Sequence, residues 1–483
     1  MQKILRPHFV LPVVAFYLYL AGSARFLGQW DSFDYLKQIV SHHLSDLGIG
    51  RPVFLGYNIV IWESIRKLFR LAPLHLEFVA MGATILLGVL GVVLFCRLAG
   101  RILSGPAVDM AVLALALSPV YAVYSGFIMT EVPMLVVLML AALFLWKTEA
   151  GHTLWCDIAG GVFFGLAVGI REQALTLGAA FLWILFTRRK PGSERFRSIL
   201  WFATAAAIVI LAPAVVWYLC DPAVFLARTK TWFRAIPMGS VQFTNNAEAS
   251  LLFTFLVCPG AWIALAGAGI KRIFARRSVS PVEGASRSAG IPHPVWGAIC
   301  CLILPIAILW RDADVQMHPR YALIVLPASV ILCASLVRRW NPTKRCLATW
   351  AILQVIFFGV AMAAFYPYRQ MQTGKIEFAR QVKESVPGSA LLIAGNYSPI
   401  LDYYRGIGVR PEWQIVWSGW DWNVSAVDAR VESAWRNHIP VYWSTDPPGW
   451  SYFERELLEV HFLFRDCRKE RIFPHLYRIL PPN

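Results

Sequence analysis

The stretch HFVLPVVAFYLYLAGSARFLGQWDSFDY (residues 8–35) joins a long apolar run to a short segment that carries two carboxylates. A helix needs about 20 mostly apolar residues to cross a bilayer, and residues 8–28 reach that length. The small residues at 21–24 resemble the end of a cleaved signal peptide, but the run continues to Phe26 and Leu27, which favours an uncleaved span. The stretch therefore predicts a membrane protein whose first span is followed directly by Asp31 and Asp34.

The composition of the whole chain supports this reading. Of its 483 residues 57% are hydrophobic and 15% are charged, whereas roughly one quarter of the residues of soluble domains are charged. The formal net charge of +16 taken alone suggests a nucleic-acid partner, but the long uncharged runs need lipid around them and exclude that partner. Eleven stretches are apolar enough to be spans: 8–28, 74–97, 106–124, 131–147, 155–170, 173–187, 198–219, 251–270, 293–310, 320–337 and 346–366.

The last quarter of the chain has a different character. Residues 367–483 contain 27 of the 74 charged residues. Helix-like segments at 375–386 and 427–438 alternate there with β-rich runs at 390–395, 441–445 and 459–464, which predicts an α/β domain. We therefore expect a polytopic all-α membrane domain of about 11 transmembrane helices over residues 1–366, followed by a small α/β outer C-terminal domain over residues 367–483.

The orientation follows from the short basic loops, because loops rich in Lys and Arg stay in the cytoplasm. The loops at 188–197, 271–287 and 338–345 fall on one side of the predicted spans, together with Lys3 and Arg6. The N-terminus is then cytoplasmic, and the C-terminal domain is periplasmic or extracellular on an inner (plasma) membrane protein. Residues 29–73 form the first outer loop, in which 53–69 has the spacing of an amphipathic interfacial helix.

Asp31 and Asp34 are the first candidates for chemistry. If their segment is helical, the two carboxylates are three residues apart and share a face. Partial desolvation at the edge of the hydrocarbon raises the basicity of a carboxylate, which suits acid/base catalysis. The alternative is that Asp31 only caps a solvated first turn.

Other ionisable residues collect at the same predicted membrane surface. They include Arg51, Glu131, Arg171, His318, Arg320 and Tyr321. An arginine in a short outer loop runs against the positive-inside tendency, so it needs a carboxylate, a phosphate or a lipid headgroup as partner. Each residue alone fits a headgroup anchor, whereas together they predict an anion-binding cavity that faces a carboxylate.

Several short motifs resemble the GT-C glycosyltransferases. They are WDSFDY (30–35), Arg51-Pro52, YSGFIMTEVP (124–133), GLAVGIREQAL (165–175) and HPRYALIVLPASVIL (318–332). The likeness is closest to the bacterial group around the protein O-mannosyltransferases and the lipid A aminoarabinose transferases. It implies transfer of a sugar, with inversion, from a polyprenyl-phosphate donor to an envelope acceptor (a lipid, a glycan or a protein) on the outer membrane face.

The resemblance also implies roles for particular residues. Asp31 corresponds to the general base of the family, and Asp34 to its helper. The second acidic position of the family motif is Ser32 in this chain, which leaves the choice of base between the two aspartates open. No cofactor is required by these motifs, and dependence on a divalent metal stays open.

The remaining candidates would act on the donor phosphate. The resemblance gives phosphate binding to Arg51, Arg171 and Arg320, because fixed guanidinium groups stabilise a departing phosphate. Glu131, His318 and Tyr321 would support that site. For Glu131, orienting an arginine or capping the fourth span is an equally good interpretation.

Two other classes of protein compete with the enzyme. A lipid or solute transporter would need ionisable residues near the middle of the membrane, whereas this chain concentrates them at the ends of its spans. A non-catalytic envelope protein whose outer domain binds glycan is compatible with the sequence. Removal of the Asp31 carboxylate distinguishes these alternatives, because a scaffold should tolerate that change.

Overall fold

The computed structural model describes residues 7–22, 30–42, 51–146, 153–187, 192–235, 319–338, 344–395, 397–417, 424–445 and 463–482. The chain forms two compact units. The first comprises Met1–Ser23, Leu44–Tyr57 and Met81–Ala364, and the second comprises Ala24–His43, Asn58–Ala80 and Phe365–Asn483. The C-terminal domain predicted to begin at residue 367 therefore shares a unit with most of the first predicted outer loop.

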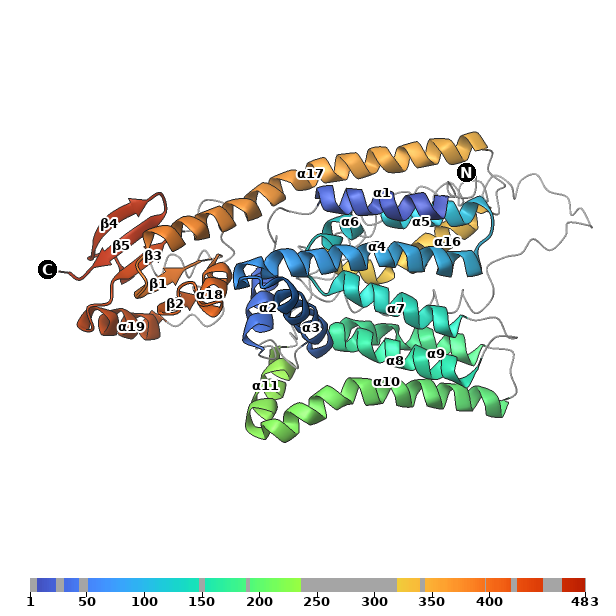
Figure 1. The fold of residues 1–483 in the computed structure, drawn as a ribbon, viewed down its shortest axis with the longest axis horizontal. Coiled ribbons are helices and arrows are strands. Elements are labelled where there is room, and N and C mark those ends of the chain that lie inside the picture. The colour runs from blue at the N-terminus through green and yellow to red at the C-terminus, as the bar shows by residue number, and fades with distance from the viewer. Residues whose placement is uncertain are drawn as a thin grey trace, which may run out of the picture. The chain divides into compact units, whose positions relative to one another are not determined.

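The first unit is helical (Figure 1). Its elements are α1 (Pro7–Gly22), α4 (Leu76–Ile102, preceded by the 3-10 turn η1, Pro73–His75), α5 (Pro106–Ala116), α6 (Pro119–Ser125), α7 (Glu131–Leu145), α8 (Leu154–Ile170), η3 (Glu172–Leu177), α9 (Gly178–Phe186), α10 (Gly192–Cys220), α11 (Pro222–Ala235), η5 (Pro319–Val325), α16 (Leu326–Arg338) and the first half of α17 (Lys344–Ser385). The turn η1, the first residues of α4 and the second half of α17 belong to the second unit.

Helices lie at nine of the eleven predicted spans, and the stretches 251–270 and 293–310 lie outside the described residues. Among the described helices, Pro73–Ile102 and Gly192–Cys220 are long and apolar enough to cross a membrane alone. The axes of α5 and α6 differ by 57° at the break between them, and this pair adds a third span if the two helices cross the membrane together. The predicted number of about eleven thus continues to rest on the sequence.

The break between α5 and α6 has a local cause. Pro119 stands at the first position of α6, where a missing backbone N–H costs nothing, but it cannot continue the hydrogen-bond ladder of α5. The Ser118 side chain caps the new helix by accepting a hydrogen bond of 3.4 Å from the Tyr121 N–H. The sequence Ser-Pro therefore ends one helix and starts the next.

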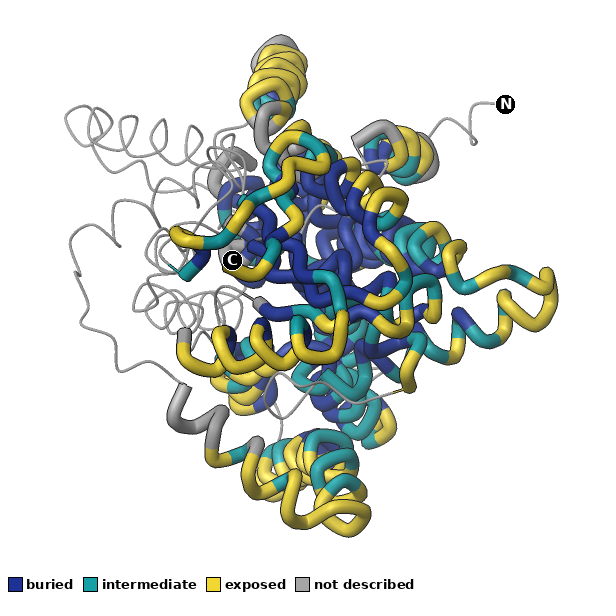
Figure 2. The backbone as a smooth tube through the Cα atoms, turned by 90° about the vertical axis from the view of Figure 1, so that its left-hand side faces the viewer, coloured by how far each residue is buried: buried dark blue, intermediate teal, exposed yellow. Residues whose placement is uncertain are grey.

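Helix α8 packs between α7 and α10 (Figure 1). Gly161 and Gly165 let the two backbones of α8 and α10 approach closely, since a Cβ at Gly165 would lie 2.9 Å from the carbonyl oxygen of Ala206. Buried residues gather where helices pack together, and exposed residues lie on the outer faces (Figure 2). On α10 the exposed residues include Ile208 and Val216, as expected of a helix that faces lipid.

The second unit contains a five-stranded sheet. Its strands are β1 (Ala390–Ala394), β2 (Trp413–Trp417), β3 (Val441–Ser444), β4 (Arg468–Phe473) and β5 (Leu476–Leu480), in the order β2-β1-β3-β5-β4. Strand β1 pairs in parallel with β2 and β3, and the C-terminal hairpin of β4 and β5 adds antiparallel to β3. The α/β architecture predicted for the tail is confirmed.

Helices α18 (Ser398–Gly406) and α19 (Val424–Arg436) complete this α/β fold. The predictions of strands at 390–395 and 441–445 and of a helix at 427–438 are confirmed. The predicted helix at 375–386 is the end of the long helix α17, and the predicted strand at 459–464 lies largely outside the described residues. The boundary expected after residue 366 therefore falls inside a continuous helix.

The predicted first outer loop contains two helices, α2 (Trp30–Ser41) and α3 (Pro52–Phe69). The helix expected at 53–69 is confirmed. In α2 the apolar side chains Phe33, Tyr35 and Leu36 are buried. This burial shows that α2, although it is short and carries two aspartates, is a packed element of the second unit.

Candidate active site

A buried ionic group lies at one end of the helices of the first unit. Glu131 is the first residue of α7 and is 1% exposed. Its Oε1 lies 2.8 Å from Arg171 Nη1 and 3.3 Å from Arg320 Nε, and both arginine side chains are almost fully buried. One carboxylate therefore stands between two guanidinium groups.

The backbone positions Arg171 at an interruption between two helices. Arg171 is the residue after α8, with an extended conformation (φ −155°, ψ 123°), and its carbonyl accepts the bond that begins η3 from the Ala174 N–H at 3.0 Å. Its guanidinium donates through Nε to Gln173 Oε1 at 2.7 Å and through Nη1 to Thr130 Oγ1 at 2.8 Å. These polar partners fix the plane of the guanidinium beside Glu131.

Arg51 joins the same end of this unit. It immediately precedes α3, where its carbonyl accepts a hydrogen bond of 2.9 Å from the Leu55 N–H and Pro52 occupies the first helical position. Arg51 Nε lies 4.0 Å from Glu172 Oε2, and both side chains are partly exposed. We name the group of Arg51, Arg171, Arg320, Glu131 and Glu172 the arginine–glutamate cluster; its formal charge is +1, three cations against two anions.

The two candidate aspartates lie on α2 in the second unit. Asp31 is in the first turn and is 8% exposed, and the neighbouring Ser32 is fully buried. Asp34 Oδ2 accepts a hydrogen bond of 2.6 Å from Gln38 Nε2, one turn further along. The helical spacing expected of Asp31 and Asp34 is confirmed, so their carboxylates share a face of α2.

The structure thus brings together four of the predicted residues, Arg51, Arg171, Arg320 and Glu131. His318 lies outside the described residues, and Tyr321 lies in η5 with a side chain that is not described. Sequence reasoning missed the roles of Thr130, Gln173 and Glu172 as partners of arginines. Their positions directly beside Glu131 and Arg171 in the chain were the available signal.

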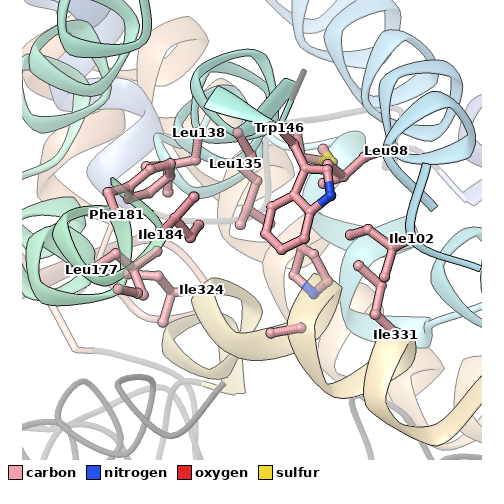
Figure 3. Close-up of a pocket in the computed structure, with 15 residues that line it drawn as sticks. Leu98, Ile102, Leu135, Leu138, Trp146, Leu177, Phe181, Ile184, Ile324 and Ile331 are labelled. Carbon is pink, nitrogen blue, oxygen red and sulfur yellow. The ribbon is translucent and has the colours of Figure 1, made fainter. Parts of the chain in front are cut away.

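An apolar groove begins one helical turn from the cluster. Leu135 lies four residues after Glu131 on α7, and Ile324 lies four residues after Arg320. From there the groove extends to Trp146, just beyond the end of α7. Figure 3 shows the apolar side chains that converge on it from several helices; they include Leu98, Ile102, Leu138, Leu177, Phe181, Ile184 and Ile331.

The two features together suit an amphiphilic anion. Arginine binds phosphate through paired, charge-assisted N–H donors, and a groove without charged residues suits a hydrocarbon chain. Among the described residues no group of three or more His, Cys, Asp or Glu has the arrangement of a metal site.

Comparison with known proteins gives a family-model match to part of the chain and a likeness of fold to nearly all of it. Residues 60–217 match the family model of the dolichyl-phosphate-mannose-protein mannosyltransferases. A comparison with curated protein sequences gives no significant match.

Among solved structures, ArnT from Cupriavidus metallidurans, crystallised with undecaprenyl phosphate, has a TM-score of 0.64 at 14% identity, over 97% of both chains. ArnT in its apo state has a TM-score of 0.63 at 15% identity, also over 97% of both chains. The arabinofuranosyltransferase AftD from Mycobacteria has a TM-score of 0.54 at 14% identity, over 99% of this chain and 40% of AftD.

The structural likeness covers nearly the whole chain and shows the fold, whereas the family model covers a third of the chain and is found from the sequence. The two comparisons agree with the short motifs quoted above, two of which lie within the matched residues 60–217. Together they confirm the resemblance of this chain to the GT-C superfamily of membrane glycosyltransferases.

Proposed function

We propose that this protein is a glycosyltransferase that moves a sugar from a polyprenyl-phosphate donor to an envelope acceptor on the outer face of the inner membrane. The observation that carries the proposal is the arginine–glutamate cluster, in which Arg171 and Arg320 are held at a buried carboxylate beside an apolar groove. Buried arginines at a membrane protein's helix ends mark a functional site. The donor named here has two chemical parts, a phosphate that would bind at the arginines and a hydrocarbon that would lie in the groove.

The cluster would bind the donor phosphate. Glu131 and Thr130 hold Arg171 in one orientation before substrate arrives, so little side-chain entropy is lost on binding. During transfer the bond between the sugar carbon and the phosphate oxygen breaks, and the electron pair leaves with the polyprenyl phosphate. Fixed guanidinium groups stabilise the negative charge that develops on that phosphate.

The groove would hold the first isoprene units of the donor. Each buried CH2 group contributes about 0.8 kcal/mol to binding, so even a partly covered chain gives substantial affinity. ArnT, whose fold this chain shares, was crystallised with undecaprenyl phosphate. That likeness supports a lipid phosphate as the donor class.

Asp31 would act as the general base. It would accept the proton from the nucleophilic group of the acceptor while that group attacks the sugar carbon from the face opposite the phosphate, with inversion. Asp34 would assist, since it shares a helical face with Asp31 and is held by Gln38. The leaving phosphate needs no proton, so one base is sufficient, unlike the two carboxylates of glycoside hydrolysis.

A transfer assay tests this function. Purified protein is incubated with a panel of radiolabelled polyprenyl-phosphate sugars and with membrane extract as acceptor. Wild type is compared with Asp31→Asn, Asp34→Asn and the matched control Asp428→Asn, which changes an exposed aspartate on α19 of the same unit. We expect Asp31→Asn to lose roughly 100-fold or more in kcat, while donor binding is kept and the control stays active.

The outcomes separate the classes of protein. Transfer of label by wild type and not by Asp31→Asn supports the reaction and the base together. Full transfer by Asp31→Asn with loss in Asp34→Asn would move the role of base to Asp34. If wild type consumed no donor from the panel with any acceptor fraction, the transferase proposal would be wrong and the scaffold and transporter alternatives would gain.

A further inference from the structure

The helix that carries the candidate base is held by the C-terminal α/β domain. Within the second unit, α2 packs against α18, the helix that follows strand β1 of the sheet. The Phe33 ring lies 5.9 Å from the Tyr403 ring, and both side chains are buried. The α/β domain therefore contributes directly to the surroundings of α2.

An ion pair joins the same two helices. Lys37 Nζ contacts Asp402 Oδ2, and both side chains are largely buried, at 26% and 19% exposure. Arg405, one turn along α18, also pairs with Asp402, with Nη2 and Oδ1 2.5 Å apart, which fixes the carboxylate in place. We name the contacts of Phe33 and Lys37 with α18 the α2–α18 contact.

The end of α18 is shaped to admit the lysine. A Cβ built on Gly406 would lie 3.1 Å from Lys37 Cγ, so any larger residue at this position would press on the lysine stem. His42, the residue that follows α2, has its Nε2 3.3 Å from Glu63 Oε1 of α3, in the same unit. Helix α2 is thus attached through Lys37 and just beyond its last residue.

Helical periodicity separates these attachments from the aspartates. At 3.6 residues per turn, Phe33 and Lys37 are four apart and share one face, whereas Asp31, two residues before Phe33, lies on another. Asp34 is three residues before Lys37 and so lies beside the contact. The α2–α18 contact therefore fixes the rotation of α2 about its axis, and with it the direction of both aspartates.

We propose that the C-terminal α/β domain is a positioning element for catalysis, and that Lys37 and Asp402 are positioning residues that aim the Asp31 and Asp34 face of α2. This inference rests on the proposed function, since it presumes that an aspartate of α2 is the base. A general base must lie within hydrogen-bond reach of the proton it takes, and a displacement of about 1 Å costs on the order of 100-fold in rate. A rotation of a short helix is enough to produce such a displacement.

A double-mutant cycle tests the proposal. Lys37→Met, Asp402→Asn and the double variant are compared in the transfer assay, with Lys37→Arg as the conservative variant. Arg436→Gln serves as a matched control, because it breaks an ion pair with Glu432 on the exposed face of α19. Thermal unfolding and hydrogen exchange of the α2 amides are measured for each protein.

We expect kcat to fall roughly tenfold in each single variant and no further in the double variant, since the two residues act as one pair. The donor KM should stay unchanged, Lys37→Arg should restore most of kcat, and exchange should rise in α2 while the melting temperature moves little.

Three results would overturn the inference in distinguishable ways. If Lys37→Met and Asp402→Asn keep the wild-type kcat while Asp31→Asn is inactive, the positioning role is refuted and the proposed function stays intact. If Asp31→Asn and Asp34→Asn both transfer the sugar at the wild-type rate, the proposed function is refuted, and this inference is refuted with it. A raised donor KM with unchanged kcat would show that the α2–α18 contact serves donor binding instead of positioning a base.

Discussion

Arg171 Nη1 and Glu131 Oε1 lie 2.8 Å apart, and no more than 2% of either side chain is exposed. A charge buried to this extent in a membrane protein is costly unless it is paired and hydrogen-bonded. Here Thr130 and Gln173 accept the other described hydrogen bonds of the guanidinium. The pair is therefore a stable part of the fold as well as the centre of the proposed phosphate site.

Removal of the Glu131 charge should destabilise the protein. Glu131→Gln leaves Arg171 and Arg320 as neighbouring buried cations without their shared carboxylate. Breaking a buried pair in this way costs about 3–5 kcal/mol, which we expect to appear as a lower melting temperature in detergent. Glu432→Gln, which removes an exposed carboxylate paired at 3.3 Å on α19, is the control and should leave the melting temperature unchanged. A stable Glu131→Gln protein would contradict the structural role of this carboxylate.

The geometry of Arg171 predicts that lysine cannot replace it. The guanidinium uses Nε for Gln173 and Nη1 for Thr130 and Glu131 at the same time. A lysine ammonium is a compact charge that lacks this planar fork. We expect Arg171→Lys to fold but to raise the donor KM at least about tenfold, because the charge remains and the orientation is lost. Measurement of KM and kcat separately checks this, and an unchanged KM would argue against a donor-phosphate role for Arg171.

Much of the fold could be predicted because the apolar stretches and the alternation in the tail are local patterns. The spans at 131–147 and 155–170 coincide closely with α7 and α8, since apolar length alone determines them. Strands β2, β4 and β5 were missed. For β4 the reason is that it is an exposed edge strand with the charged sequence RKERIF and lacks apolar alternation. A strand of that kind is specified by its partner and by its place at the edge of the sheet.

For the candidate site too, the sequence predicts what is local and misses what depends on packing. The arginines could be predicted because a cation at an outer helix end needs an anionic partner. Which carboxylate supplies that partner depends on the packing of α7 against α8, so the sequence left Glu131 with two equal interpretations. The contact of Lys37 with Asp402 joins residues 365 positions apart, and no local pattern in a single sequence reports such a pair.

Arg51 should matter for the donor and little for stability. It lies 4.0 Å from Glu172, and the two side chains are 20% and 49% exposed, so the pair is worth about 0–1 kcal/mol to folding. We expect Arg51→Gln to melt close to wild type and to raise the donor KM severalfold, with a smaller effect at high salt. Arg66→Gln, which alters an exposed arginine further along α3, is the matched control. Equal effects of both changes on KM would show that Arg51 acts only through general charge.

Filling the apolar groove should weaken donor binding selectively. Ala142 lines the groove on α7, and Ala142→Phe would occupy part of the space proposed for the isoprenoid chain. Each CH2 group shut out costs about 0.8 kcal/mol, so loss of two raises the donor KM roughly tenfold. Ala203→Phe makes the same change on the exposed face of α10 and should leave KM unaltered. If Ala142→Phe also bound a donor with a short, water-soluble tail less well, this result would contradict the proposal that the groove binds the hydrocarbon chain.

The close approach of α8 and α10 should depend on glycine at two positions. A Cβ on Gly161 would meet the carbonyl oxygen of Phe202, and one on Gly165 would lie 2.8 Å from Val209 Cβ. Because backbone atoms cannot yield as flexible side chains do, Gly161→Leu must force the helices apart, and overpacking of this kind costs about 1–3 kcal/mol or more. Gly82→Leu on α4 is the matched control, since nothing lies within 4 Å of its added Cβ.

Arg171 directly follows α8, so separation of the helices should also move the guanidinium. We therefore expect Gly161→Leu to lower the melting temperature and the donor affinity together, and a variant that lost stability but bound donor normally would show that the cluster is held independently of this packing.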